Sequence, residues 1–358
     1  MLVAISLSKQ LQMEYFKRFK RNNGIKRVCI LDSSYALLQY LLLCSEKDIR
    51  TTYFFWGNGV SQEVKKYFDG MNTSFPIIKD NPIIKMLLYH VIAPILWPFI
   101  LDDNIEYWGQ DHLHYGSAIL RQHKFHLLED GVLNYNTRPA YKKYVKLRKY
   151  LYGELGLSTW TYAGEEKTCA WIHLTGLKDS PILKNHKVVV NKFEDLWQLS
   201  SENKKGMICD IYGLNPNILR SLYGVKKILL TEPLSEDHDL TEQEKIDLYR
   251  DILNSIGSKE ILIKPHPRET TNYNEAFPEY EVLRLRIPME LLSLVNIRFE
   301  EAYSLFSTAL YNFPYHIKVC YIGCEVHPKL KARYPHSTAS NFEVMHHDLE
   351  IVKFKERK

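Results

Sequence analysis

The chain has 358 residues, of which 45% are hydrophobic and 25% charged, and its formal net charge is +5. This length and composition are typical of a globular protein with two domains and a sizeable core in each. The positive charge is small and argues against a nucleic-acid-binding protein, which usually carries a basic stripe, and it favours an anionic small substrate or a membrane surface.

The six cysteines are scattered along the chain and form no CxxC pair. Several of them lie in apolar runs, as small core residues do. We therefore expect a reducing, cytoplasmic compartment and no zinc site. Residues 1–5 are apolar without a basic lead, and Lys9 interrupts before a long apolar stretch forms, so no signal peptide is expected.

Short apolar runs alternate with helical patterns through the first domain, which we expect to span residues 1–222. The expected strands are 27–31, 51–56, 105–108, 125–128, 168–174 and 187–190, and the expected helices are 35–44, 61–68, 111–121 and 193–199. Alternation of this kind predicts an α/β domain with a parallel sheet.

Two segments of the first domain raise the question of whether the protein contacts a membrane. The run 82–101 is the most apolar window, but a lysine and prolines interrupt it, so we expect a buried or crevice-lining helix that does not span a bilayer. Residues 138–152 are basic and amphipathic. They indicate either a solvated helix face or a face that docks on an anionic membrane or acceptor.

The strand at 125–128 delivers two acids and a glycine, Glu129-Asp130-Gly131, to its carboxyl end. Adjacent carboxylates repel each other, and in a crevice the pKa of one can rise far enough for it to act as a base. Gly131 allows a sharp turn or the close approach of a ligand. An ordinary Asp-Gly turn is the alternative interpretation.

The second domain is expected to span 223–345, followed by a basic tail at 346–358. Its expected strands are 226–231, 261–263, 280–283 and 318–322, and its expected helices are 241–255, 288–292 and 309–313. Thr241 followed by Glu244 is a capping-box pattern that opens the first of these helices.

The strand at 261–263 is followed by the strongest chemical signal in the chain, Lys264-Pro265-His266-Pro267-Arg268-Glu269. At the carboxyl end of a strand in an α/β sheet, such a loop faces the crevice where ligands bind. The two cations can hold a phosphate, while the imidazole donates a hydrogen bond or a proton to an anionic leaving group. A basic surface turn that contains a stray histidine is the alternative.

Two further sites lie downstream. Ser307 and Thr308 stand at a loop-to-helix junction, where exposed backbone N–H groups and hydroxyls can hold an anion, and they can cap the helix at the same time. Glu290 lies close to the start of the helix at 288–292. No Asp-x-Asp element follows a strand directly, so the metal chelation typical of many nucleotide-diphosphate-sugar enzymes is not expected.

These motifs occur in a specific order: Glu129-Asp130-Gly131, the loop 230–237, the His266 loop, the segment 288–292 and Ser307-Thr308-Ala309. In that order the chain resembles glycosyltransferase family 52, bacterial enzymes of lipooligosaccharide and capsule assembly that are chiefly sialyltransferases. The resemblance is closest over residues 225–315. It implies the GT-B fold, in which two Rossmann-like domains face each other across a cleft, with the acceptor bound by the first domain and a CMP-sugar by the second.

The resemblance also implies an inverting, metal-free mechanism with residues in named roles. One acid of Glu129-Asp130, for which we favour Asp130, would deprotonate an acceptor hydroxyl, and His266 would assist the departure of cytidine monophosphate. The residues expected to hold the donor are Lys264, Pro267, Arg268, Glu290, Ser307 and Thr308. Asp237, in the loop after the first strand of the second domain, remains the alternative base.

The expected reaction moves N-acetylneuraminic acid from CMP-Neu5Ac to a terminal galactose of a surface glycan or glycolipid, without a cofactor. Peripheral contact with the cytoplasmic face of the inner membrane and a homodimer stay open, and no nucleic-acid partner is expected. Three alternatives remain: a transferase that uses another nucleotide sugar, a non-catalytic glycan-binding protein, and a phosphatase-like enzyme with His266 as its nucleophile.

Overall fold

The computed structural model describes residues 24–57, 59–72, 104–110, 120, 123–129, 169–175, 187–311, 313–341 and 350–354. The chain divides into two compact units, Met1–Ile211 and Tyr212–Lys358, whereas the sequence places the domain boundary after residue 222. The segments 82–101 and 138–152, on which a membrane contact was considered, lie outside the described residues. Across the described ranges, no helix is long and apolar enough to cross a membrane.

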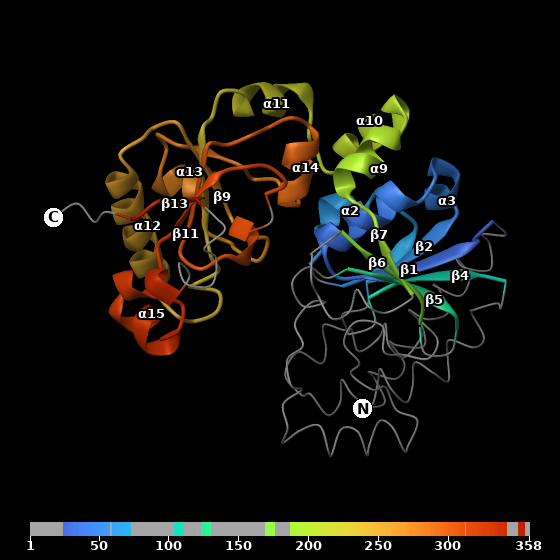
Figure 1. The fold of residues 1–358 in the computed structure, drawn as a ribbon, viewed down its shortest axis with the longest axis horizontal. Helices are drawn as coiled ribbons and strands as arrows, with labels where there is room; N and C mark the ends of the chain where they lie inside the picture. The colour runs from blue at the N-terminus through green and yellow to red at the C-terminus, as the bar shows by residue number, and fades with distance from the viewer. Residues whose placement is uncertain are drawn as a thin grey trace, which may run out of the picture. The chain divides into compact units, whose positions relative to one another are not determined.

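The first unit contains a seven-stranded parallel sheet in the order β3-β2-β1-β4-β5-β6-β7. Its strands are β1 (Arg27–Leu31), β2 (Thr52–Trp56), β3 (Gly70–Asn72), β4 (Glu106–Gly109), β5 (Phe125–Leu128), β6 (Cys169–Leu174) and β7 (Val188–Val190). The helices are α2 (Ser34–Leu43), α3 (Glu46–Arg50), α4 (Gln62–Lys65), α9 (Phe193–Leu199) and α10 (Glu202–Ile211). Figure 1 shows α2, α3, α9 and α10 on one face of this sheet.

Local sequence explains how the first strand leads into the first helix. The four residues after Arg27 in β1 are buried, as expected for a central parallel strand. The Ser33 hydroxyl then accepts a hydrogen bond from the Ala36 N–H and so caps α2. Eight of the ten residues of α2 are buried, including Gln39, which is why this helix is apolar on nearly every side.

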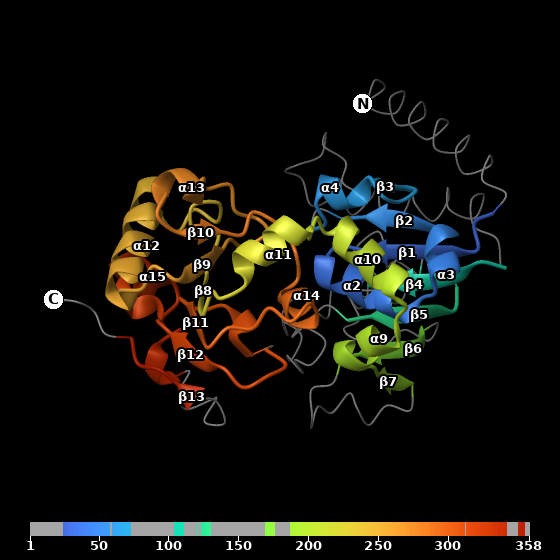
Figure 2. The same ribbon diagram turned by 90° about the horizontal axis from the view of Figure 1, so that it is seen from above.

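The second unit contains a six-stranded parallel sheet in the order β10-β9-β8-β11-β12-β13, visible strand by strand in Figure 2. Its strands are β8 (Lys227–Leu230), β9 (Ile261–Lys264), β10 (Glu281–Val282), β11 (Glu301–Ser304), β12 (Lys318–Tyr321) and β13 (Glu350–Ile351). The helices are α11 (Pro216–Leu222), α12 (Glu242–Ile256), α13 (Tyr273–Ala276), α14 (Met289–Leu294) and α15 (Pro328–Arg333), with short 3-10 helices η7 (Thr308–Tyr311) and η8 (Cys324–Val326). The prediction of an α/β fold with two parallel sheets is confirmed.

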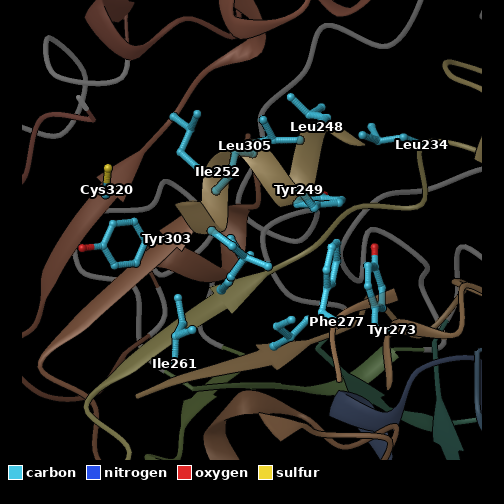
Figure 3. Close-up of a cluster of buried hydrophobic side chains, with 14 of the residues drawn as sticks. Leu234, Leu248, Tyr249, Ile252, Ile261, Tyr273, Phe277, Tyr303, Leu305 and Cys320 are labelled. Atoms are coloured by element: carbon cyan, nitrogen blue, oxygen red, sulfur yellow. The ribbon is translucent and has the colours of Figure 1, made fainter. Parts of the chain in front are cut away.

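The helix α12 packs on this sheet and contributes side chains to the core of the second unit. The predicted capping box is present, with Thr241 and Glu244 each bonded to the other's backbone N–H, and Gly257 ends the helix in the left-handed conformation. Figure 3 shows Tyr249 and Ile252 of α12 among the buried side chains that cover β9 and β11. Because this packing holds the strands rigidly, the loops at their carboxyl ends start from fixed positions.

One local expectation was wrong. The sequence predicted an α-helix at 309–313, whereas the structure has the 3-10 helix η7 and ends it at Tyr311. Pro314 explains why Phe313 is outside the helix, because the residue before a proline is pushed out of the α conformation. All six cysteines are free, and five of them are buried, as predicted for core thiols.

Candidate active site at the carboxyl edge of the second sheet

The strand order identifies where a ligand can bind in the second unit. From β8 the chain passes outward to β9 and β10, and then returns to β11 on the other side of β8 before it continues to β12. The order therefore reverses between β8 and β11, and in open α/β sheets ligands bind outside the carboxyl ends of the strands at such a switch point. The loops that begin at Thr231, Pro265 and Leu305 all lie at this edge.

His266 sits in the loop after β9, between Pro265 and Pro267. Its ring nitrogen Nδ1 accepts a hydrogen bond from the Arg268 N–H at 3.2 Å, which assigns the proton of the neutral ring to Nε2. Burial first, and then the charges of Arg268 and Lys264, lower the pKa of His266 to about 4. In the free protein at neutral pH, His266 is therefore a neutral imidazole whose Nε2–H can donate a hydrogen bond.

Glu269 fixes the shape of this loop from within. Its buried carboxylate accepts hydrogen bonds from the His266 N–H, the Thr231 hydroxyl and the Tyr273 hydroxyl, each at 2.6 Å. The Lys245 ammonium, which is fully buried, forms an ion pair with it at 2.8 Å. These four bonds join β8, α12, α13 and the loop, so the position of His266 depends on Glu269.

Lys264 is the last residue of β9 and is 7% exposed. Burial lowers its pKa to about 8, against the opposing influence of the charges on Glu290 and Glu269. A lysine with that pKa is mostly cationic at neutral pH, and its ammonium group is poorly solvated. An anion that binds nearby therefore stabilises the charged form of Lys264. Glu290 lies in the first turn of α14, as the sequence predicted for a residue at a helix N-terminus.

Arg268 and Asp237 form a two-pronged ion pair, with Arg268 Nη1 and Nη2 at 2.6 and 2.9 Å from the two carboxylate oxygens. Asp237 lies in the loop after β8, so this pair ties two loops of the site together. Both oxygens of Asp237 accept from the guanidinium, which disfavours this carboxylate as a base. Arg268 remains 59% exposed at its side chain and can also face a ligand.

Ser304 and Ser307 follow β11 on the other side of the switch point. Ser304 is fully buried, and its hydroxyl oxygen accepts from the Ser307 N–H at 3.2 Å. The Ser307 hydroxyl oxygen accepts from the Ala309 N–H at 3.5 Å and so caps η7, as predicted. Thr308 is the first residue of η7, and its side chain lies outside the described residues.

In the first unit, Glu129 lies where the sequence placed it, at the carboxyl end of β5. It is 3% exposed and accepts from the Thr175 N–H at 2.6 Å, the Thr175 hydroxyl at 3.0 Å and the Tyr35 hydroxyl at 3.2 Å. These bonds tie α2, β5 and β6 together, so Glu129 has a structural role whether or not it meets a substrate. Asp130 and Gly131 lie outside the described residues.

Sequence reasoning assigned no role to three charged residues of the second unit, namely Glu232, Lys245 and Glu269, although Glu232 and Glu269 lie within the motifs that carry the family resemblance. A signal existed for Lys245, because it shares one helical face with the buried Leu248, Tyr249 and Ile252 of α12. A charge within an apolar stripe needs a buried partner. No comparable signal marks Glu232 or Glu269, whose surroundings depend on which strands become neighbours.

The depressed pKa of His266 can be measured by NMR titration of its imidazole. We expect a pKa of about 4 in the free protein, well below the ordinary 6.5, and a rise when inorganic phosphate is added, because a bound anion favours the charged ring. An ordinary pKa for His266 that phosphate leaves unchanged would contradict this description of the site.

Comparison with known proteins agrees with this geometry. The family model for glycosyltransferase family 52 matches residues 100–348, which include the whole edge described above. The chain belongs to glycosyltransferase family 52. A relative of this family 52 chain in Haemophilus influenzae (strain ATCC 51907 / DSM 11121 / KW20 / Rd), described as an uncharacterized protein, is 30% identical over 319 residues, covering 87% of this chain and 98% of the relative.

A solved structure supports the fold. The alpha/beta-galactoside alpha-2,3-sialyltransferase from the luminous marine bacterium Photobacterium phosphoreum aligns with a TM-score of 0.56, covering 94% of this chain and 100% of that protein. Sequence identity in that alignment is 14%, so the similarity concerns the fold. The family 52 chain therefore has the two-sheet architecture of a GT-B glycosyltransferase, as predicted.

Proposed function

We propose that the protein is an inverting, metal-independent sialyltransferase that moves N-acetylneuraminic acid from CMP-Neu5Ac to a terminal galactose of a bacterial surface glycan, lipooligosaccharide or capsule. The observation that carries this proposal is the His266 loop. A neutral imidazole with an Nε2–H donor lies in the loop after β9, flanked in sequence by Lys264 and Arg268, at the same carboxyl edge of the sheet as the Ser307 cap after β11. This set of groups suits a departing phosphate monoester.

The proposed step is a direct displacement at the anomeric carbon. The acceptor oxygen forms the new bond, and the bond from the anomeric carbon to the phosphate oxygen breaks, so that cytidine monophosphate leaves with the electron pair. The transition state is like an oxocarbenium ion, and negative charge accumulates on the phosphate. Attack opposite to the leaving group inverts the anomeric centre.

Each residue has one part in this step. The phosphate binds at Lys264, Arg268, Ser307 and Thr308, and its charge raises the pKa of His266. The ring then takes up a second proton from solvent and passes one proton to the departing oxygen, which returns it to the neutral form. Pro267 keeps the loop rigid, and Glu290 holds the ribose hydroxyls of the donor. The acceptor's proton goes to Asp130, because Asp237 is held by Arg268 and Glu129 by Tyr35 and Thr175.

The reaction is proposed to take place in the cytoplasm, with the membrane surface and a second copy of the chain as possible partners besides the donor and the acceptor. A lipid-linked acceptor favours peripheral contact with the cytoplasmic face of the inner membrane, and the free, mostly buried cysteines suit a reducing compartment. The charge on the departing phosphate is balanced by protein cations, so no metal ion is assigned a step. Nucleic acid has no part in it, and a homodimer is compatible with it.

Calorimetry with the two product nucleotides tests the donor class. CMP is expected to bind more tightly than UDP, and EDTA is expected to leave CMP binding unchanged, because protein cations hold the phosphate. A preference for UDP that depends on added Mg²⁺ would favour a transferase that uses a nucleotide diphosphate sugar. Binding of neither nucleotide, together with binding of glycan, would favour a non-catalytic lectin.

A further inference from the structure

Glu232 is a buried acid at the centre of the edge where the strand order reverses. It follows β8 directly, is 6% exposed, and its N–H donates to the Tyr249 hydroxyl at 2.7 Å. Its side chain reaches the loop after β11, where Ser304 Oγ lies 3.4 Å from Oε1 and the Ser307 side chain also hydrogen-bonds to the carboxyl group. Glu232 thus bridges the two strand ends between which a ligand is expected.

The cations around Glu232 are engaged elsewhere. Lys245 is shared by Glu269 at 2.8 Å and Glu236 at 2.9 Å, and Arg268 is paired with Asp237. In the part of the chain that the structure describes, no lysine, arginine or histidine lies within ion-pair distance of Glu232. A charge left unpaired in the interior is costly, and a carboxyl group avoids that cost by keeping its proton.

The neighbouring acid strengthens this preference. Burial first, and then the negative charge of Glu269, raise the pKa of Glu232 to about 8, although its bonds to Ser307 and Ser304 and the charge of Arg268 oppose the rise. Glu236 differs: burial raises its pKa, but the Thr270 N–H and Lys245 outweigh that effect and bring it to about 2. Burial also raises the pKa of Glu269, but its ion pair with Lys245 opposes that rise. Glu232 has no such ion pair among the described residues, so it is the acid of this cluster that we expect to keep its proton at neutral pH.

The proton on Glu232 decides whether the Ser307 hydroxyl can donate a hydrogen bond to a ligand. A serine has one hydrogen to donate and two lone pairs to accept with. If Glu232 were ionised, Ser307 would have to donate its hydrogen to that carboxylate. If Glu232 is protonated, it donates to the Ser307 oxygen, which also accepts from the Ala309 N–H. The hydroxyl hydrogen of Ser307 is then available to an incoming anion.

We propose that Glu232 is a positioning residue of the phosphate site, which as a neutral acid turns the Ser307 hydroxyl toward the donor phosphate and keeps negative charge away from it. This inference rests on the proposed function for the identity of the donor, but its chemistry needs only a phosphate at this edge. Ionisation of Glu232 has two costs for the ligand: it removes the Ser307 donor and places a carboxylate beside the phosphate. Phosphate affinity should therefore fall as pH rises through the pKa of Glu232.

The test compares the pH dependence of phosphate binding in the full-length wild type and in Glu232→Gln. The glutamine amide donates to Ser307 as the protonated acid does, and it does not ionise. The ratio of the wild-type Kd to the Glu232→Gln Kd, for inorganic phosphate and for CMP, is expected to increase by up to about tenfold per pH unit above pH 8. Lys264 also titrates in this range, but it does so in both proteins and cancels in the ratio.

Two further variants complete the design. Glu232→Ala, which cannot donate to Ser307, should bind phosphate more weakly than Glu232→Gln at every pH. The exposed Glu279→Gln should keep the wild-type pH dependence. Because a buried substitution can impair folding, the infrared band of a protonated carboxyl group is measured in parallel: the wild type should show a band that titrates near pH 8, and Glu232→Gln should lack it.

The outcomes are distinct. Parallel pH curves for the wild type and Glu232→Gln, or no protonated carboxyl band at neutral pH, would overturn the role of Glu232. The ratio of the wild-type Kd to the Glu232→Gln Kd for inorganic phosphate could rise with pH in a protein that does not transfer sialic acid. That result would support the role of Glu232 and reject the donor proposed above.

Discussion

Replacing His266 with alanine is expected to lower kcat for glycosyl transfer by about a hundredfold to ten-thousandfold, the usual contribution of a positioned proton donor. The Nε2–H of this ring is the group assigned to the departing phosphate, and the variant has no substitute for it. The KM for the donor should change much less, because Lys264, Arg268 and Ser307 still hold the phosphate. Steady-state kinetics with CMP-Neu5Ac measures both constants.

The control for this variant is His316→Ala, which removes an exposed histidine that pairs with Glu350 and precedes the amino end of β12, away from the carboxyl edge. It should leave both kinetic constants unchanged. A His266→Ala enzyme that keeps near-normal kcat would remove His266 from the chemistry. A large rise in KM at constant kcat would assign the ring to binding alone.

Replacing Glu269 with alanine is expected to destabilise the protein by about 3–5 kcal/mol, the range for removing one partner of a buried ion pair. Lys245 is fully buried and would retain the ion pair with Glu236 and the weaker bond to Ser235, while Thr231 and Tyr273 would lose the acceptor for their hydroxyl hydrogens. Urea denaturation followed by tryptophan and tyrosine fluorescence measures the loss.

Glu279→Gln is the matched control, because Glu279 is an exposed acid in the same unit and should cost little. A loss below about 1 kcal/mol for Glu269→Ala would show that the hydrogen-bond cluster around Glu269 does not hold the loop. Glu269→Ala should also reduce kcat in the folded fraction, since the His266 N–H would no longer be held at 2.6 Å from a carboxylate.

The fold and the His266 loop could be predicted because their signals are local. Apolar runs alternate with helical patterns, a capping box marks α12, and the prolines and cations around His266 are consecutive in the sequence. Parallel sheets bury both faces, so their strands read as short apolar runs even without knowledge of their neighbours. The ordered set of motifs then identified the family.

The partnerships within the site could not be predicted, because they depend on the strand order. Arg268 meets Asp237 and Thr231 meets Glu269 only because β8 lies beside β9. Glu232 faces Ser304 only because β11 returns to the other side of β8. A single sequence does not state which strands are adjacent, so it cannot show which acid is paired and which keeps its proton.

The most direct test is a product assay with purified protein, CMP-Neu5Ac and lactose in the presence of EDTA, with product mass determined by mass spectrometry. The proposed mechanism predicts sialyl-lactose and CMP in equal amounts in the wild type, and a loss of both in His266→Ala. Transfer that requires added metal, or the absence of both transfer and donor hydrolysis while another nucleotide sugar is consumed, would contradict it.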